Sequence, residues 1–160
     1  MKLLVIFYSF EGNTKLIAEN IAKEINADIL EINPVEKIKS KGFMKFFWGG
    51  KQAMMNEKPP LVPFNINPNN YDIIFIGTPV WAWGPAPPIK SFFEQCKISE
   101  KNIALFCCHG GAKGKTLEKM KSAIGENNNF IGQIDFIDPL KKNTKKNINL
   151  AINWAKNILP

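Results

Sequence analysis

The sequence of 160 residues is long enough for one domain of ordinary size and too short for two independent catalytic domains. Its formal net charge of +7 comes entirely from lysine, and the absence of arginine together with the even spread of the lysines argues against a nucleic-acid-reading protein. No apolar run approaches the roughly 20 residues that span a bilayer, and the opening residues have no signal-peptide pattern, so we expect a cytoplasmic protein without a membrane span.

The first part of the chain predicts a strand, a helix and a second strand. Leu3 to Tyr8 is a continuous apolar run, as in strands that are buried on both faces of a parallel sheet. From Thr14 onward, apolar residues recur at every fourth position and predict a helix that packs on this sheet and ends near Asn26. Ala27 to Ile32 alternates apolar and charged residues and predicts a strand nearer the sheet edge, which Pro34 closes.

The interval from Pro34 to Asn70 is longer than a simple crossover connection. It contains an aromatic-rich segment, Phe43 to Trp48, which must pack on another surface. Three positions fit this segment: a short helix over a sheet edge or over the ligand crevice, a dimer or partner surface, and a membrane contact. The prediction is therefore one domain over residues 1–160 with an aromatic-rich insertion at about residues 35–70.

The rest of the chain alternates strands with helices. The predicted strands are Asp72–Gly77, Asn102–Cys108 and Phe130–Ile137, and the predicted helices are Ile89–Cys96 after Pro88, Thr116–Ile124, and a final one striped by Ile148, Ile152 and Ala155. Alternation of this kind predicts right-handed crossovers and an α/β fold, a doubly wound five-stranded parallel sheet with helices on both faces. Its ligand crevice is expected at the carboxyl ends of the strands.

The first loop at that edge is suited to a phosphate group. It reads Ser9-Phe10-Glu11-Gly12-Asn13-Thr14 and opens directly into a helix, whose N-terminal dipole favours an anion. Gly12 allows close approach of the backbone, while the hydroxyls of Ser9 and Thr14 and several amides can donate to phosphate oxygens. The alternative is an ordinary strand-to-helix turn with Thr14 as the cap.

The second loop carries two tryptophans. It reads Thr78-Pro79-Val80-Trp81-Ala82-Trp83-Gly84-Pro85, and its prolines argue against regular structure. An indole at this edge can stack on a flat ligand such as an isoalloxazine ring, and we expect Trp81 to lie nearer the ring than Trp83. Alternatively, one or both tryptophans fill the core.

The third loop, Cys107-Cys108-His109-Gly110-Gly111-Ala112-Lys113-Gly114-Lys115-Thr116, is rich in glycine, which allows close contact with a ring edge. It nearly spells a nucleotide-binding P-loop but is one residue short, with His109 in place of the first glycine, so we do not expect nucleotide hydrolysis. Cys107 and Cys108 should point to opposite faces of the sheet with at least one in the core; a redox-active pair or a metal site with His109 are the alternatives. His109 itself either hydrogen-bonds the ligand or lies exposed.

These three loops together resemble the flavodoxin family, whose phosphate signature reads Thr or Ser, any residue, Thr, Gly, any residue, Thr. The chain departs from it only at Glu11, which replaces the middle threonine, so this carboxylate must either point away from the phosphate or have its charge offset. The resemblance implies the strand order 2-1-3-4-5 and FMN bound without a covalent link. It implies cofactor contacts from Ser9, Phe10, Glu11, Gly12, Asn13, Thr14, Pro79, Val80, Trp81, Ala82, Trp83, Cys108, His109, Gly110, Gly111 and Gly114.

The function implied by this resemblance is that of a small electron carrier between redox partner proteins, either monomeric or weakly dimeric. The alternative is an NAD(P)H-dependent oxidoreductase acting on quinones or similar acceptors. The familiar carriers of the family are acidic, whereas here Lys113, Lys115 and His109 are expected near the flavin, where positive charge would raise its reduction potential. A signalling receiver is excluded because Tyr8-Ser9 and Gly77-Thr78 stand where its acidic residues would be.

Overall fold

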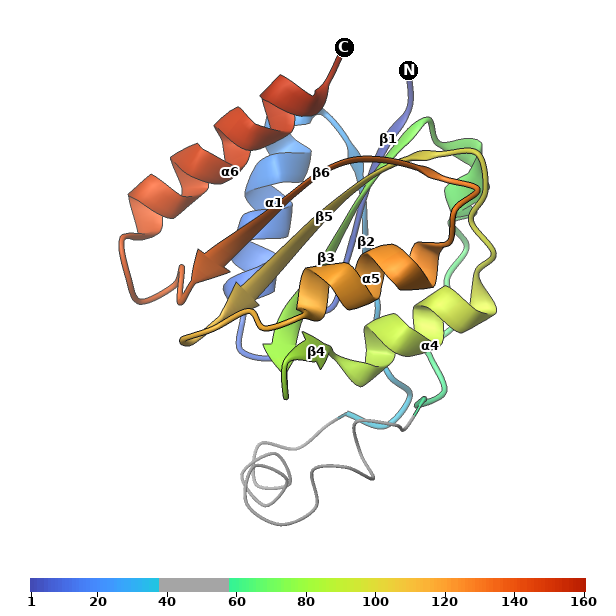
Figure 1. Cartoon of the computed structure of the whole chain (residues 1–160), viewed down its shortest axis with the longest axis horizontal. Coiled ribbons are helices and arrows are strands. Elements are labelled where there is room, and N and C mark those ends of the chain that lie inside the picture. Colours follow the sequence, from blue (N-terminus) through green and yellow to red (C-terminus); the bar gives the residue numbers. More distant parts are fainter. Residues whose placement is uncertain (38–57) are drawn as a thin grey trace.

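Five parallel strands form the central layer of the structure, a computed structural model that describes residues 1–37 and 58–160 (Figure 1). Their spatial order is β2 (Asp28–Glu31), β1 (Leu3–Phe7), β3 (Ile73–Trp81), β5 (Asn102–His109) and β6 (Asn129–Ile137). A short strand, β4 (Gly84–Pro85), pairs antiparallel with the end of β3. Numbered along the chain, the parallel strands have the order 2-1-3-4-5, so the predicted fold and strand order are confirmed.

Helices cover both faces of this sheet (Figure 1). On one face α1 (Asn13–Ile25) lies beside α6 (Thr144–Ile158), and the other face carries α4 (Pro87–Gln95) and α5 (Thr116–Ile124). Because both faces are covered, the central strands are mostly apolar, and every residue of β1 is apolar and buried.

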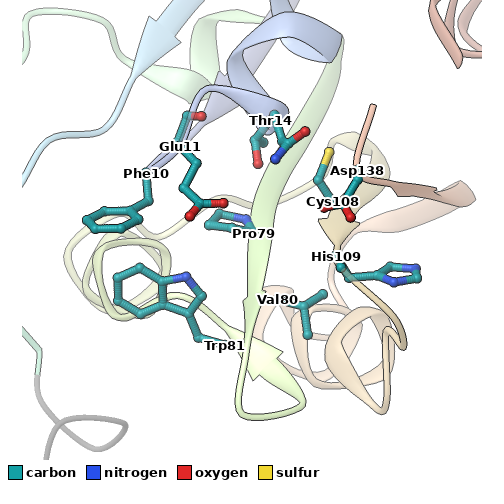
Figure 2. Close-up of a pocket in the computed structure, with 12 residues that line it drawn as sticks. Phe10, Glu11, Thr14, Pro79, Val80, Trp81, Cys108, His109 and Asp138 are labelled. Carbon is teal, nitrogen blue, oxygen red and sulfur yellow. The ribbon is translucent and has the colours of Figure 1, made fainter. Parts of the chain in front are cut away.

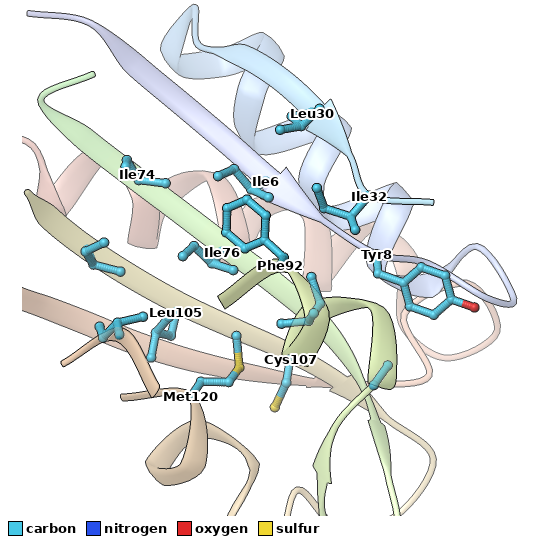
Figure 3. Close-up of a cluster of buried hydrophobic side chains, with 14 of the residues drawn as sticks. Ile6, Tyr8, Leu30, Ile32, Ile74, Ile76, Phe92, Leu105, Cys107 and Met120 are labelled. Carbon is cyan, nitrogen blue, oxygen red and sulfur yellow. The ribbon is translucent and has the colours of Figure 1, made fainter. Parts of the chain in front are cut away.

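Two hydrophobic clusters lie on opposite sides of the sheet. The first joins Ile17 of α1 and Ala151 of α6 to one face. Figure 3 shows the second cluster, in which Phe92 of α4 and Met120 of α5 belong with Ile76 and other sheet residues. The sheet is therefore held between two layers of helices, and this leaves its carboxyl edge as the place for a ligand.

The predicted elements agree with the structure except at the end of β3. The prediction ended this strand at Gly77, but the strand continues to Trp81, because Thr78 and Pro79 pair with β5 and the last two residues pair with β4. The inference that the prolines exclude regular structure is wrong. Pro79 stands at the end of the β3–β5 ladder and Pro85 lies in a short edge strand, where a missing N–H disrupts little pairing.

Of the long interval after β2, the structure describes the two flanks. An isolated antiparallel bridge joins Pro34 to Leu61, and a 3-10 helix, η1 (Pro68–Asn70), precedes β3. Most of the predicted insertion, including Phe43 to Trp48, lies outside the described residues. In the described ranges no helix combines the length and the apolar composition needed to cross a membrane.

Candidate functional site

A cavity opens at the carboxyl edge of the sheet, where the ends of four strands converge (Figure 2). Its lining comes from the loops after β1, β5 and β6 and from the end of β3. The lining residues are Ser9, Phe10, Glu11, Asn13, Thr14, Pro79, Val80, Trp81, Cys108, His109, Gly110 and Asp138. All of these except Asp138 were expected from the sequence, so the three predicted loops do meet at one place.

Five residues predicted for the cofactor site do not line this cavity: Gly12, Ala82, Trp83, Gly111 and Gly114. Gly12 still shapes the first loop, because its φ of 96° makes the turn into α1. Trp83 lies outside the cavity, and the residue is 65% exposed.

The N-terminus of α1 faces this cavity with few of its donors satisfied. Its first internal hydrogen bond runs from the Leu16 N–H to the Gly12 carbonyl at 2.9 Å, and the Lys15 N–H donates to Ser9 Oγ at 3.1 Å. The amides of Gly12, Asn13 and Thr14 precede these bonds and have no acceptor within the described ranges. A ligand anion would find three oriented donors here.

The side chain of Thr14 adds an unusual polar group to the same place. The residue is 1% exposed, and its hydroxyl has no hydrogen-bond partner of ordinary geometry in the described part of the chain. Its polar neighbour is the Cys108 thiol, a weak hydrogen-bonding group. The alternative in which Thr14 caps the helix is wrong, because the N-cap is Gly12 and no side chain caps through it.

Two carboxylates also line the cavity. The side chain of Glu11 extends from the first loop toward Trp81 in Figure 2 and lines the cavity. Its orientation relative to a bound phosphate stays a prediction. Asp138 follows β6 with a φ of 40°, and its N–H donates to the His109 carbonyl at 3.0 Å. The sequence signal for Asp138 was available, since the carboxyl end of the last strand must lie at the same edge as the others.

The loop after β6 is tied to the first loop. The Leu140 N–H donates to Asn13 Oδ1 at 3.0 Å, a contact between residues 127 positions apart. A Cβ at Gly12 would stand 3.1 Å from Leu140 Cδ1, so the two loops are in close contact at that point. The last loop therefore supports the phosphate-suited turn.

One wall of the cavity is aromatic. Trp81 is 7% exposed and meets Tyr8 and Phe10 edge-to-face, with ring centroids 6.0 and 5.5 Å away. Burial, with a smaller contribution from the Glu31 carboxylate, raises the pKa of Tyr8 to about 12. Trp81 thus lies at the site and Trp83 outside it, in the order that the sequence predicted.

His109 is held away from solvent at the end of β5. It is 8% exposed, so the exposed-loop alternative is wrong. Its Nε2 lies 2.9 Å from an oxygen of Asp135, whose other oxygen accepts from Lys113 Nζ at 2.7 Å. Burial opposes ionisation of Asp135, but the hydrogen bonds from His109 and Lys113 outweigh it and lower the pKa of the carboxyl group.

This cluster changes the expected electrostatics of the cavity. In Figure 2 the His109 ring points away from the side where Phe10 and Trp81 lie. Because the Lys113 ammonium is paired with Asp135, the positive field that the sequence suggests near the flavin is weaker than a count of lysines implies.

The two adjacent cysteines belong to opposite sides of the sheet, as predicted. Cys107 is part of the cluster under α4 and α5, and Cys108 is part of the cluster under α1 and α6. Burial raises the pKa of Cys107 and raises that of Cys108 to about 12, so both are neutral thiols at physiological pH. No group of three or more metal-binding side chains is found in the ranges that the structure covers.

Comparisons with known proteins agree with this geometry. A family model described as flavodoxin matches residues 2–151. The flavodoxin-like domain-containing protein BilS of Clostridioides difficile is 30% identical over 139 residues, which cover 82% of this chain and 63% of that protein. The chain thus spans less than two thirds of the length of this relative.

Similar solved structures also have the flavodoxin fold. A flavoprotein from Lactobacillus acidophilus in complex with FMN is 30% identical, with 88% of this chain and 97% of that chain covered and a TM-score of 0.71. Oxidised flavodoxin 1 from Bacillus cereus shares the fold at 16% identity and a TM-score of 0.63, over 99% of this chain and 97% of that chain.

Proposed function

The chain belongs to the flavodoxin family, and on this premise we propose that it binds FMN in the cavity of Figure 2 and carries electrons between redox partner proteins. The observation that supports the proposal best is the N-terminus of α1, whose unused amides lie beside the buried hydroxyl of Thr14. Donors left without partners at a helix N-terminus are suited to a phosphate dianion.

In this proposal the phosphate is held without a cation. None of the described residues that line the cavity is a lysine, so in this proposal the helix dipole and the amides of Gly12, Asn13 and Thr14 balance the negative charge. Ser9 Oγ accepts from Lys15, and its own O–H remains able to donate. Glu11 works against the phosphate, because its carboxylate lines the same cavity.

The flat ring of the cofactor fits the other side of the cavity. Trp81 offers an aromatic wall that its neighbours Tyr8 and Phe10 hold in place, and Gly110 leaves space for close approach. The cavity volume of about 230 Å³ is below the roughly 300–1,000 Å³ of pockets that enclose a whole ligand, so part of the ring would stay exposed. Bound FMN would supply one- and two-electron chemistry, and these residues would set its access and orientation.

Titration of the apoprotein with FMN and with riboflavin tests the phosphate site. We expect saturable 1:1 binding of FMN in calorimetry and binding of riboflavin that is weaker by about a hundredfold, because each charge-assisted hydrogen bond to phosphate is worth about 1.5–3 kcal/mol. Equal affinity for FMN and riboflavin would mean that the N-terminus of α1 does not hold the phosphate. If neither flavin binds, the proposed FMN site is refuted.

One observation favours the alternative, an NAD(P)H-dependent oxidoreductase acting on quinones or similar acceptors. The loop from Gly110 to Lys115 is exposed and carries no aromatic side chain, which would leave space for a nicotinamide beside the ring. Anaerobic mixing of FMN-loaded protein with NADPH or NADH separates the two functions. A carrier keeps its yellow colour until a partner reductase is added, whereas an oxidoreductase loses it at once.

We further propose that the protein acts in the cytoplasm. Its three cysteines are free, with Cys107 and Cys108 buried, and a reducing compartment keeps such thiols unpaired.

A further inference from the structure

The turn between β3 and β4 presents a large apolar side chain to solvent. Trp81 pairs with Gly84, so Ala82 and Trp83 are the two residues of a tight hairpin turn, and both have positive φ, 45° and 58°. This backbone is that of a type I′ turn, where Asn-Gly is strongly preferred and a bulky residue is disfavoured. The chain nevertheless has tryptophan here, with 65% of its surface exposed.

Trp83 is oriented as well as exposed. A Cβ at Gly114, which itself has a φ of 53°, would stand 2.6 Å from Trp83 Cβ and 2.7 Å from Trp83 Cδ1. Any side chain at position 114 would therefore displace the indole. Gly114 thus leaves the space that Trp83 occupies, yet this contact buries little of the indole. Neither backbone preference nor core packing accounts for a tryptophan at this position.

Lysines lie close to the turn that carries this indole. Lys119 Nζ lies 3.4 Å from the Cβ position of Gly84, next to Trp83 in the chain. Half-buried Lys90 of α4 has a lowered pKa, first because of burial and then because of the nearby Lys119 and Lys58 ammonium groups. Lys115 is the N-cap of α5, where a positive charge opposes the helix dipole.

The described acidic groups of this region do not pair with Lys115 or Lys119. Glu94 pairs with Lys58, and Asp135 pairs with His109 and Lys113. Lys115 and Lys119 form no ion pair within residues 1–37 and 58–160. Glu118 follows Lys115 in the first turn of α5 and is the described carboxylate nearest to both lysines along the chain. A positive surface with an apolar centre results.

This surface borders the cavity, since Trp81, two residues before Trp83, forms the cavity wall. We propose that Trp83 is the apolar anchor of a docking surface on which Lys115 and Lys119 receive an acidic redox partner protein. The proposal rests on the proposed electron-carrier function and adds the charge of the partner. Exposed tryptophan is among the residues that most often dominate binding energy, and complementary charge speeds encounter.

A strongly acidic [4Fe–4S] ferredoxin serves as the probe, titrated into FMN-loaded protein at low salt. We expect saturable binding that weakens as salt rises, and a Kd raised about tenfold or more by Trp83→Ala. The pair Lys115→Glu and Lys119→Glu should weaken binding to a similar extent. Leu150→Ala and Lys146→Glu on α6 are matched exposed controls that should leave the Kd unchanged.

The double variant Ala82→Asn with Trp83→Gly separates docking from folding. Asn-Gly suits the type I′ turn, so this variant should unfold at a higher temperature than the wild type while it loses affinity for the ferredoxin. Its FMN affinity should be unchanged, because neither position lines the cavity; loss of FMN binding would count against the proposed function instead.

Three results would overturn the docking proposal. One is the absence of saturable ferredoxin binding at low salt. Another is an unchanged Kd in Trp83→Ala. The third is tighter Trp83-dependent binding to phosphatidylserine vesicles or to single-stranded DNA, which would assign the surface to a different class of partner.

Discussion

The hydroxyl of Thr14 is buried where no ordinary hydrogen-bond partner meets it, which costs folding energy and prepares the site for a ligand. We predict that Thr14→Val, which has nearly the same shape, weakens FMN binding about tenfold or more through loss of one charge-assisted hydrogen bond. The apoprotein should be as stable as the wild type or more so. FMN fluorescence quenching and thermal unfolding measure the two quantities.

Ser122→Ala is the control for Thr14→Val, because this hydroxyl bonds only to the Glu118 carbonyl on the exposed side of α5. An apoprotein that Thr14→Val destabilises strongly, with FMN affinity unchanged, would show that the hydroxyl serves the fold instead.

Glu11 is the position where the chain departs from the phosphate signature of its family. Its carboxylate lines the cavity, so it repels a phosphate dianion. We predict that Glu11→Gln tightens FMN binding by removing the charge and that Glu11→Thr tightens it further by adding a donor. Calorimetry at low and high salt checks this, since the gain in Glu11→Gln should shrink as salt screens the repulsion. Weaker binding in both variants would contradict the argument.

Gly77 shows how β3 fits between its neighbours. It pairs with Phe7 of β1 on one side and Phe106 of β5 on the other, and a Cβ here would stand 2.1 Å from Phe106 Cζ. We predict that Gly77→Ala lowers the free energy of unfolding by about 1–3 kcal/mol, because the Phe106 ring must move within a packed core. Urea denaturation measures the change.

Two further variants make this prediction specific. Phe106→Leu in the Gly77→Ala background should restore part of the lost stability, as expected for residues in direct contact. Gly111→Ala should change stability by less than about 0.5 kcal/mol, because nothing lies within 4 Å of its Cβ position. Additive effects of the first two substitutions would contradict a clash with the ring.

Regular elements were predictable from sequence where one local pattern determines them. The apolar stripe from Ile17 to Ile25 lies wholly on one face of α1, and the left-handed Asn26 ends that helix as expected. The extension of β3 past Gly77 was not predictable in this way. It depends on the pairing of Thr78 and Pro79 with β5 and of Trp81 with Gly84, contacts that exist only in the folded sheet.

The candidate site was predictable to the extent that topology brings strand ends together. The composition of three loops predicted that they form the site, and in the structure residues from all three line one cavity. Asp138 was not predicted, because the loop after β6 has neither the glycines nor the tryptophans that mark the other loops of the site. The burial of His109 was left open because its partner, Asp135, belongs to a neighbouring strand.

The stability of the chain as a whole should fall in alkaline solution. The pKa of Tyr8 and that of Cys108 are each raised to about 12 from ordinary values of 10.0 and 9.0. The unfolded chain therefore ionises first as pH rises, so the stability present at neutral pH is lost progressively between about 9 and 12. Urea midpoints measured from pH 8 to pH 11 test this, and Tyr8→Phe should make the decline shallower. A midpoint that stays constant up to pH 11 would contradict it.

The hydrogen bond between Leu140 and Asn13 has a consequence for biosynthesis. The turn that is suited to phosphate is translated long before its support, because Leu140 lies 127 positions after Asn13. A nascent chain that ends before β6 also lacks the strand that positions Asp138. Flavin loading should therefore wait until the loop after β6 has been synthesised and has left the ribosome.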